Sequence, residues 1–405
     1  MTLRDRFENT SRFRTWSLAL TGVGVLSVVI GFFVYGTGDS EHQGRFWATM
    51  LQNSVYFLLV VNAAMFFICA TTLAMGGWQM SFRRVTEAIS VAVIPLGIIA
   101  LIVLLALVFG HQHHIYHWLE PHGDPLIEGK SGFLNPTFFA VWTVLTIGLW
   151  IFLGWKMRRL SRELDENPLP DVDAGRKYVF KNTVWASLYI VWFALTVAST
   201  TPWLWLMSID AHWYSTMYSW YTFASTFVAG IVLITLFVVY LKNRNYLEIV
   251  NEEHIHDLGK FMFAFSIFWT YLWFSQYMLI WYANIPEETV YFKPRTEGPY
   301  TGLFWLTVII NFLAPLLLLM RRRAKRNYTT VTFMAVLIIF GHWLDFNQMV
   351  FPGPFPERVQ LNIFDFGVAL GFIGVIMWAT SRALERAPLY AKNHPFFKET
   401  IIHHT

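Results

Sequence analysis

The segment Phe261–Glu288, FMFAFSIFWTYLWFSQYMLIWYANIPEE, carries no charged side chain before its last two residues. An α-helix rises about 1.5 Å per residue, so residues 261–285 reach about 37 Å and can cross a hydrocarbon core of about 30 Å. At about 100° per residue, one face of this helix collects the polar residues Ser266, Thr270, Tyr277 and Asn284. Lipid cannot satisfy a polar stripe, so we expect it either to contact other helices or to line a hydrated proton path.

The composition is that of a polytopic membrane protein. Of the 405 residues, 55% are hydrophobic and only 14% are charged, whereas soluble proteins carry about 25% charged residues. The single cysteine, Cys69, lies in an apolar segment, which excludes a cysteine-based disulfide, zinc or iron–sulfur framework. The basic start, residues 1–15, lacks a signal-peptide cleavage site and is expected to lie on the cytoplasmic membrane surface. The net charge of +4 gives no indication of nucleic-acid binding.

Ten apolar segments have the length of a membrane span, which predicts an all-α integral membrane protein with ten transmembrane helices. The expected spans cover residues 16–35, 46–75, 86–109, 136–155, 183–207, 217–241, 261–285, 300–320, 331–351 and 361–383. They form one membrane domain, residues 16–383, which is followed by a cytoplasmic tail, residues 384–405. Three prolines within spans, Pro95, Pro202 and Pro315, are expected to kink their helices.

The basic residues predict the orientation, because Lys and Arg gather on the cytoplasmic side of membrane proteins. With the N-terminus inside, 25 of the 30 Lys and Arg residues fall on the cytoplasmic side. The outer residues are Arg45, Lys130, Lys293, Arg295 and Arg358. One missing helix near the middle of the chain would destroy this asymmetry, so we expect ten spans with both termini in the cytoplasm.

Ionisable side chains inside spans are costly and are therefore candidates for function. His342 and Asp345 are three residues apart in the ninth span and share a helix face, and Asp365 is expected at a comparable depth in the tenth. The three side chains are expected to meet. A histidine with carboxylates in this setting forms either a proton relay or a structural pair that joins two helices.

Four further residues at the ends of spans are candidates for proton entry or exit. Asp210 and His212, in the outer segment MSIDAHWYST, belong either to a helix end and its flanking loop or to a proton exit. His256 and Asp257 precede the seventh span on the inner side, below its polar stripe. Asp257 either stabilises the helix N-terminus through the helix dipole or receives protons.

The histidines of the longest outer loop do not predict a metal site. They are His111, His113, His114 and His117, and no acid or cysteine completes a recognisable ligand spacing. Only His342 lies well inside a span, whereas a b-type haem normally takes axial histidines from within the bundle. We therefore expect no metal, no cofactor and no catalytic residue in this chain.

Four segments resemble the ActF subunits of bacterial alternative complex III, which belong to the NrfD/PsrC-like membrane proteins. These segments are MSIDAHWYST, WFSQYMLIWYANIPEETVYF, RRRAKRNY and KNHP, at residues 207–216, 273–292, 321–328 and 392–395. The resemblance covers essentially the whole chain. It implies a protein of the bacterial inner membrane in which spans two to five and six to nine form two four-helix bundles, with two peripheral helices.

The resemblance also implies function and partners. Alternative complex III is a quinol:electron-acceptor oxidoreductase, and an ActF-type chain in it would be surrounded by membrane lipid and hold no redox centre. A larger NrfD-like paralogue would bind menaquinol, other subunits would carry iron–sulfur clusters and haem c, and a terminal oxidase is a further implied partner. The implied function is to support menaquinol oxidation, with electrons passing to a periplasmic acceptor such as cytochrome c, and to conduct protons.

Two other functions are compatible with the sequence. The chain could itself bind and oxidise quinol at a pocket that includes His342 and Asp345, because a quinol site needs a proton acceptor beside an apolar slot. It could also be an independent secondary transporter, although the two halves lack the paired Gly/Pro-interrupted segments of that class.

Overall fold

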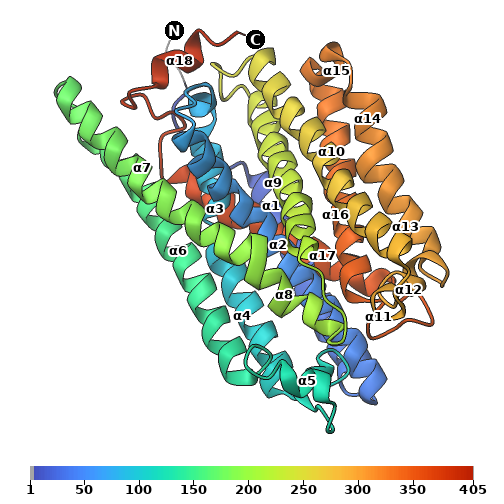
Figure 1. Cartoon of the computed structure of the whole chain (residues 1–405). Coiled ribbons are helices and arrows are strands. Elements are labelled where there is room, and N and C mark those ends of the chain that lie inside the picture. Colours follow the sequence, from blue (N-terminus) through green and yellow to red (C-terminus); the bar gives the residue numbers. More distant parts are fainter. Residues whose placement is uncertain (1–3, 405) are drawn as a thin grey trace.

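The computed structural model describes residues 4–404, and within this range the chain is helical and contains no β-strand (Figure 1). Nine of the described helical segments are long and apolar enough to cross a membrane. These segments are Ser11–Gly36, Glu41–Leu73, Arg83–Phe109, Pro136–Glu166, Val172–Ile209, Met217–Asn243, Thr301–Leu319, Tyr328–Val350 and Ile363–Glu385. The chain therefore has the all-α architecture of a multi-pass membrane protein, as its composition predicts.

The long elements are α1 (Ser11–Gly31), α2 (Ser40–Leu73), α3 (Arg83–Ser90) with α4 (Val93–Phe109), α6 (Pro136–Glu166), α7 (Val172–Leu195), α9 (Met217–Asn243), α10 (Glu252–Ala283), α16 (Tyr328–Val350) and α17 (Ile363–Glu385). The shorter helices are α5 (Pro125–Gly129), α8 (Thr201–Trp205), α11 (Pro286–Thr289), α12 (Lys293–Thr296), α13 (Thr301–Val308), α14 (Ala314–Leu319), α15 (Arg322–Arg326) and α18 (Phe397–Ile401). Single π-helical turns cover Phe32–Gly36, Thr196–Thr200 and Ile309–Leu313, and 3₁₀ turns cover Trp78–Ser81, His117–Leu119 and Met207–Ile209.

Helix α10 is also long enough to span a bilayer, but among the described helices it falls outside the nine most apolar segments. Its Trp, Tyr, Ser, Thr and Gln residues are less hydrophobic than the Leu, Ile and Val residues of the other helices. The helix begins before the predicted residue 261, because Asn251 caps it and accepts hydrogen bonds from the N–H groups of Glu253 and His254. The apolar pattern therefore marked only part of this helix.

The helices are interrupted near all three prolines, as predicted. The π-helical turn at residues 196–200 lies directly before the α8 turn that contains Pro202, and the turn at residues 309–313 lies directly before Pro315 in α14. Close to Pro95, a turn at residues 91–92 separates α3 from α4. Proline lacks an N–H group and crowds the preceding turn, so the backbone widens or breaks there.

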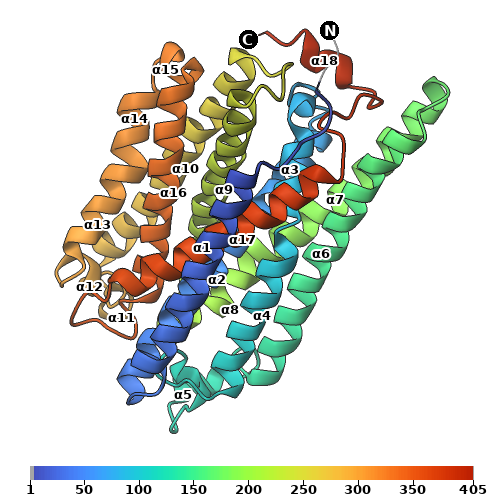
Figure 2. The ribbon, with the colours of Figure 1, turned by 180° about the vertical axis from the view of Figure 1, so that it is seen from behind.

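The helices form two groups that lie side by side (Figure 1). In the first group, α2 and α6 each pack against α4 and α7; in the second, α9 and α14 each pack against α10 and α16, and α13 continues α14 through a π-helical turn. Helix α2 also contacts α9 and α16, which places it between the groups. Helices α1 and α17 pack against each other across the back of the molecule (Figure 2).

Polar contacts between α2 and α16 join the two groups. The side-chain amide of Gln52 donates to the Trp343 carbonyl (3.0 Å), and the indole N–H of Trp343 donates to Asn53 Oδ1 (2.9 Å). The Asn347 amide donates to Gln52 Oε1 (3.2 Å). All four side chains are buried, and a lipid environment offers them no other partner, so these bonds fix the register of α2 against α16.

The first and last described segments lie at the same end of the molecule (Figure 1). The Leu389 N–H donates to the Asp5 carbonyl (2.7 Å), and Lys392 Nζ pairs with the Asp5 carboxylate (2.7 Å). The short helices α5, α11 and α12 lie at the other end. We call the end that holds the first and last described segments the terminal end, and the end that holds α5, α11 and α12 the opposite end.

Helices α1 and α17 approach closely because two glycines face each other. A Cβ atom added to Gly24 would lie 2.2 Å from Gly371 Cα, whereas one added to Gly22 would meet nothing within 4 Å. We expect Gly24→Ala to force α1 away from α17 and to lower the melting temperature of the purified protein by several degrees, because overpacking costs about 1–3 kcal/mol. Gly22→Ala is the matched control and should leave the melting temperature unchanged or slightly higher. Equal melting temperatures for the two variants would contradict the close contact.

Candidate functional site

The buried carboxyl group of Asp345 on α16 is surrounded by three hydrogen-bond donors. The Tyr221 hydroxyl donates to Oδ1, and both Ser225 Oγ (2.9 Å) and Trp269 Nε1 (3.0 Å) donate to Oδ2. Tyr221 and Ser225 lie one turn apart on α9, and Trp269 lies on α10, so three helices of the second group meet at this carboxyl group. Such donors offset the cost of removing a carboxylate from water.

His342 lies about one turn before Asp345 and is fully buried. Its Nδ1 atom is 2.9 Å from Ser225 Oγ and 3.8 Å from Asp345 Oδ2. Because the Ser225 hydroxyl donates to Asp345, its oxygen is free to accept the Nδ1 proton of His342, and this hydrogen-bond pattern leaves Nε2 as the basic nitrogen. Nε2 is buried without a hydrogen-bond partner among the described residues. The three side chains thus form one hydrogen-bonded chain with a proton acceptor at its end.

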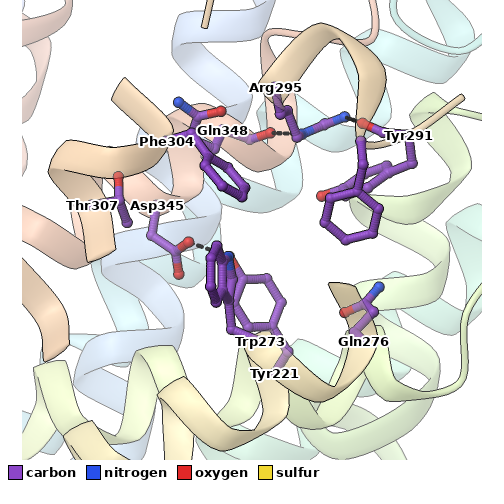
Figure 3. A pocket seen from close by; sticks show the side chains of 10 residues that line it. Tyr221, Trp273, Gln276, Tyr291, Arg295, Phe304, Thr307, Asp345 and Gln348 are labelled. Carbon is purple, nitrogen blue, oxygen red and sulfur yellow. Dashed lines mark hydrogen bonds between the residues drawn. The ribbon is translucent and has the colours of Figure 1, made fainter. Parts of the chain in front are cut away.

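A cavity of about 20 Å³ lies beside the Asp345 carboxyl group (Figure 3). Tyr221, Gln276, Arg295 and Gln348 contribute to its wall. The volume suffices for about one water molecule. Gln276 Nε2 and both side-chain amide atoms of Gln348 are buried, and no described residue bonds to them. Unpaired buried amides are costly, so the cavity has the polar lining that holds ordered water.

Arg295 connects this cavity with the surface at the opposite end. Its Nε donates to the Gln348 carbonyl (2.9 Å), its Nη1 donates to the Tyr291 carbonyl, and its guanidinium lies 3.5 Å from the centre of the Tyr291 ring. Its Nη2 lies 4.0 Å from Asp210 Oδ2. Asp210 is partly exposed, and its surroundings raise the pKa of its carboxyl group through loss of hydration, while Arg295 opposes that rise. The predicted exit residue Asp210 therefore lies one contact away from the cavity.

The predicted polar stripe of α10 extends over only part of the helix. Ser266 is fully buried and its hydroxyl has no hydrogen-bond partner among the described residues. Thr270 donates back to the Ser266 carbonyl (2.8 Å), and Tyr277 is half-buried. Asn284 is exposed and ends the helix in the left-handed conformation with φ of 48°. Its inclusion in the stripe was wrong, because the helix terminates at this residue.

Asp365 does not join the Asp345 site, contrary to our prediction. Among the described residues its carboxylate is bound by Arg45, whose Nη1 lies 3.0 Å from Oδ1 and whose Nη2 donates to Oδ2. Thr49 Oγ1 (2.8 Å) and the Asn362 N–H (2.9 Å) complete its partners. Helix α17 packs on α1, α2 and α3, so this side chain faces α2 rather than the second group. Asp365 therefore joins α17 to α2 through a buried ion pair.

At the terminal end, Asp257 contacts the C-terminal tail. Its carboxylate pairs with Lys260 Nζ (2.5 Å) and with His403 Nε2 (2.7 Å), and His256 Nδ1 lies 4.0 Å away. The tail therefore covers the terminal end of α10. His256 and Asp257 are neighbours in the sequence and lie together. The C-terminal tail partly covers Asp257.

His212 lies in the loops of the opposite end. Its Nε2 is 2.5 Å from Asp124 Oδ2 in the loops of the opposite end, and the side chain is 57% exposed. The hydrogen bond from His212 lowers the pKa of the Asp124 carboxyl group. This surface pair has no described hydrogen bond to the Asp345 site.

Sequence reasoning missed five residues of the site: Tyr221, Ser225, Trp269, Gln276 and Arg295. Trp269 and Gln276 are three and ten residues after Ser266, which is a helical spacing that predicts one shared face. Tyr221 and Ser225 are four residues apart on α9 and also share a face. Arg295 was one of the few basic residues assigned to the outer side. Helical periodicity could have indicated that Trp269 and Gln276 share a face, and that Tyr221 and Ser225 share a face. It could not have indicated that these faces meet at Asp345.

No protein-family model matches this sequence. A comparison with curated proteins finds no match either.

The Arg45–Asp365 pair is buried, which makes its loss costly. We expect Arg45→Met to lower the free energy of unfolding by about 3–5 kcal/mol, because it leaves the Asp365 carboxylate uncompensated. Replacing both residues, with Arg45→Met and Asp365→Leu, should restore much of this loss. The exposed pair of Arg358 with Glu41 is the control, and Arg358→Met should change stability by less than about 1 kcal/mol. Denaturation of the purified variants measures these differences, and a double variant less stable than Arg45→Met would refute the explanation.

Docking of the tail is expected to depend on pH through His254. His254 Nε2 lies 2.9 Å from Thr400 Oγ1 in α18, and burial, with His403 and Lys242 nearby, lowers the pKa of His254 to about 4 against the opposing charge of Asp257. The imidazole is neutral when the tail is docked but binds a proton near pH 6.5 when exposed. The equilibrium constant for docking of the tail should therefore fall as the pH falls from about 6.5 toward 4. The expected change is up to about tenfold per pH unit.

Hydrogen exchange of the α18 amides measures this effect. His403 also contacts Asp257, so the measurement is made in His403→Gln, in which that contact is absent. In that background the protection of α18 should fall with falling pH, and the added change His254→Gln should remove the dependence. A pH dependence that persists without both histidines would exclude His254 as its cause.

Proposed function

We propose that this chain is a non-redox, integral membrane subunit of a bacterial quinol:electron-acceptor oxidoreductase of the alternative complex III type. In this proposal menaquinol, iron–sulfur clusters and haem c belong to partner subunits, which include an NrfD-like paralogue. The chain supports their assembly in the inner membrane and conducts protons. The segments that resemble ActF suggest the complex, and the buried relay at Asp345 is the observation that carries the proton function.

The proposed topology has ten spans with both termini in the cytoplasm. Helix α10 supplies the tenth span, because its 32 residues exceed the length required by a bilayer. Its polar residues are tolerated because several of them, including Ser266, Trp269 and Gln276, are buried against the protein. The common location of the first and last described segments and the distribution of Lys and Arg support the even number of spans.

The relay begins at the basic nitrogen of His342. A proton that binds Nε2 makes the imidazole cationic, and the Nδ1 proton can then pass to Ser225 Oγ while the Ser225 proton passes to Asp345 Oδ2. The net result is one proton moved from His342 Nε2 to the carboxyl group, over contacts of 2.9 Å on both sides of Ser225. Imidazole is suited to this step because it can accept a proton at one ring nitrogen and release one from the other.

The second half of the path leads from Asp345 to the opposite end. A water molecule in the neighbouring cavity can take the proton from the carboxyl group, and the unpaired amides of Gln276 and Gln348 can hold that water. Arg295 and Asp210 follow toward the surface. The positive charge of Arg295 disfavours a proton that stays bound beside it. The proton is therefore released to the solvent.

The size of the cavity favours proton conduction over quinol oxidation by this chain. Sites for drug-sized molecules typically occupy about 300–1,000 Å³, whereas the cavity beside Asp345 measures about 20 Å³. It accommodates water and not a quinol ring. Quinol binding by the paralogous partner remains the arrangement that we propose.

The proton function is tested in the whole complex reconstituted in liposomes. Asp345→Asn, His342→Gln and Ser225→Ala should each reduce the protons translocated per quinol to those released by quinol oxidation itself, while electron transfer continues. Thr226→Val is the matched control, because the Thr226 hydroxyl bonds only to carbonyls of its own helix. Unchanged proton stoichiometry in all three variants would exclude the relay. Loss of quinol binding in Asp345→Asn would instead favour the enzyme alternative.

A further inference from the structure

A groove of about 1070 Å³ lies between α4, α6 and α17. Figure 2 shows the ribbons of these three helices. Helices α4 and α6 pack against each other, and α17 also contacts α4. The groove is lined near the terminal ends of α6 and α17 by charged side chains and along α4 by apolar ones. The Asp345 site lies in the other group of helices, so the groove is separate from it.

The charged part of the groove is strongly basic. It contains the five arginines Arg158, Arg159, Arg162, Arg382 and Arg386, and the two acids Glu163 and Glu166. Arg159 pairs with Glu163 (3.1 Å), and Arg382 pairs with Glu385 outside the groove (3.6 Å). The remaining three arginines have no carboxylate partner among the described residues. The groove therefore has an excess of positive charge.

Arg158 anchors the inner wall of the groove. It is buried, and its Nη1 donates to Ser90 Oγ (3.0 Å) at the end of α3. Arg162 follows one turn later on α6, and Arg386 faces the groove from the end of α17. Three guanidinium groups from two helices thus line one groove, and among the described residues none of them lies within ion-pair distance of a carboxylate. Arginines in such a setting are suited to binding phosphate.

The apolar part continues from the arginines along the length of the helices. Ile94, Ile98, Trp155 and Trp378 line it, and between 37% and 52% of each side chain is exposed. In a membrane-spanning protein, large apolar side chains with this exposure contact lipid, and tryptophan marks the boundary between hydrocarbon and headgroups. Positive charge and apolar surface therefore meet in the groove at the level of the lipid headgroups.

We propose that this groove binds an anionic phospholipid. Its phosphate contacts Arg158, Arg162 and Arg386, and its acyl chains lie along Ile98 and Trp378. Charge complementarity selects an anionic headgroup, because basic pockets between spans on the cytoplasmic side attract anionic lipids. Free phosphate would use only the basic half of the groove. A zwitterionic lipid would leave the excess positive charge of the groove unbalanced. The bound lipid joins α17 to the first group of helices.

The test uses the purified chain in detergent, and its outcome is independent of the proposed proton relay. Phosphatidylglycerol added in mixed micelles should raise the melting temperature by several degrees, whereas phosphatidylcholine and inorganic phosphate should not. The variant with Arg162→Gln and Arg386→Gln should bind phosphatidylglycerol about tenfold more weakly. The control with Arg176→Gln and Lys177→Gln loses two exposed cations of α7 and should keep full binding.

Three results would overturn the proposal. They are equal stabilisation by phosphatidylcholine, an effect of inorganic phosphate as large as that of phosphatidylglycerol, and undiminished lipid binding by the double arginine variant. Should that variant fail to fold, a photoreactive phosphatidylglycerol tests the unaltered chain and should label residues of the groove. Labelling elsewhere, or crosslinks from groove residues to a partner protein in the intact complex, would show that lipid is not the occupant.

Discussion

The fold depends on the requirement that a polar group inside the bilayer find its partner within the protein. Asp345 shows the consequence most directly, because its carboxyl group takes donors from Tyr221, Ser225 and Trp269. No single helix could provide them. The second group of helices is therefore organised around one buried carboxyl group, and any movement of α9 or α10 away from α16 would leave that group unsatisfied.

The same requirement separates polar groups that hold the structure together from those that can hold water. Gln52 and Asn53 of α2 bond to α16, and Arg45 bonds to Asp365, so these contacts join helices. Around the cavity, Gln348 is buried and has no side-chain partner among the described residues. A fully paired group stabilises a contact, whereas an unpaired group beside a cavity requires water. This difference supports the proposal that protons move through the Asp345 site.

The ends and orientations of helices were less predictable than their existence. Hydrophobic runs of spanning length gave the location of the membrane helices, since apolar length is a local property. Asn251 extended α10 beyond its apolar run through capping, and Asn284 ended it. Asp365 appeared equivalent to Asp345 by depth, yet it faces Arg45 because α17 packs on α1 and α2. Depth follows from counting residues, but the direction of a side chain follows from the neighbours of its helix.

By itself, the sequence determined an all-helical membrane chain, the breaks near its prolines and the few ionisable residues, such as His342 and Asp345, that lie within its spans. Only the tertiary structure decided that Ser225 lies between these two residues, that Gln276 and Gln348 share a cavity with Asp345, and that Asp365 belongs elsewhere. The physical reason is that hydropathy and helical period depend on residues close in the sequence. A hydrogen-bonded relay depends on how helices far apart in the sequence are rotated against each other, and that rotation is set by packing of the whole bundle.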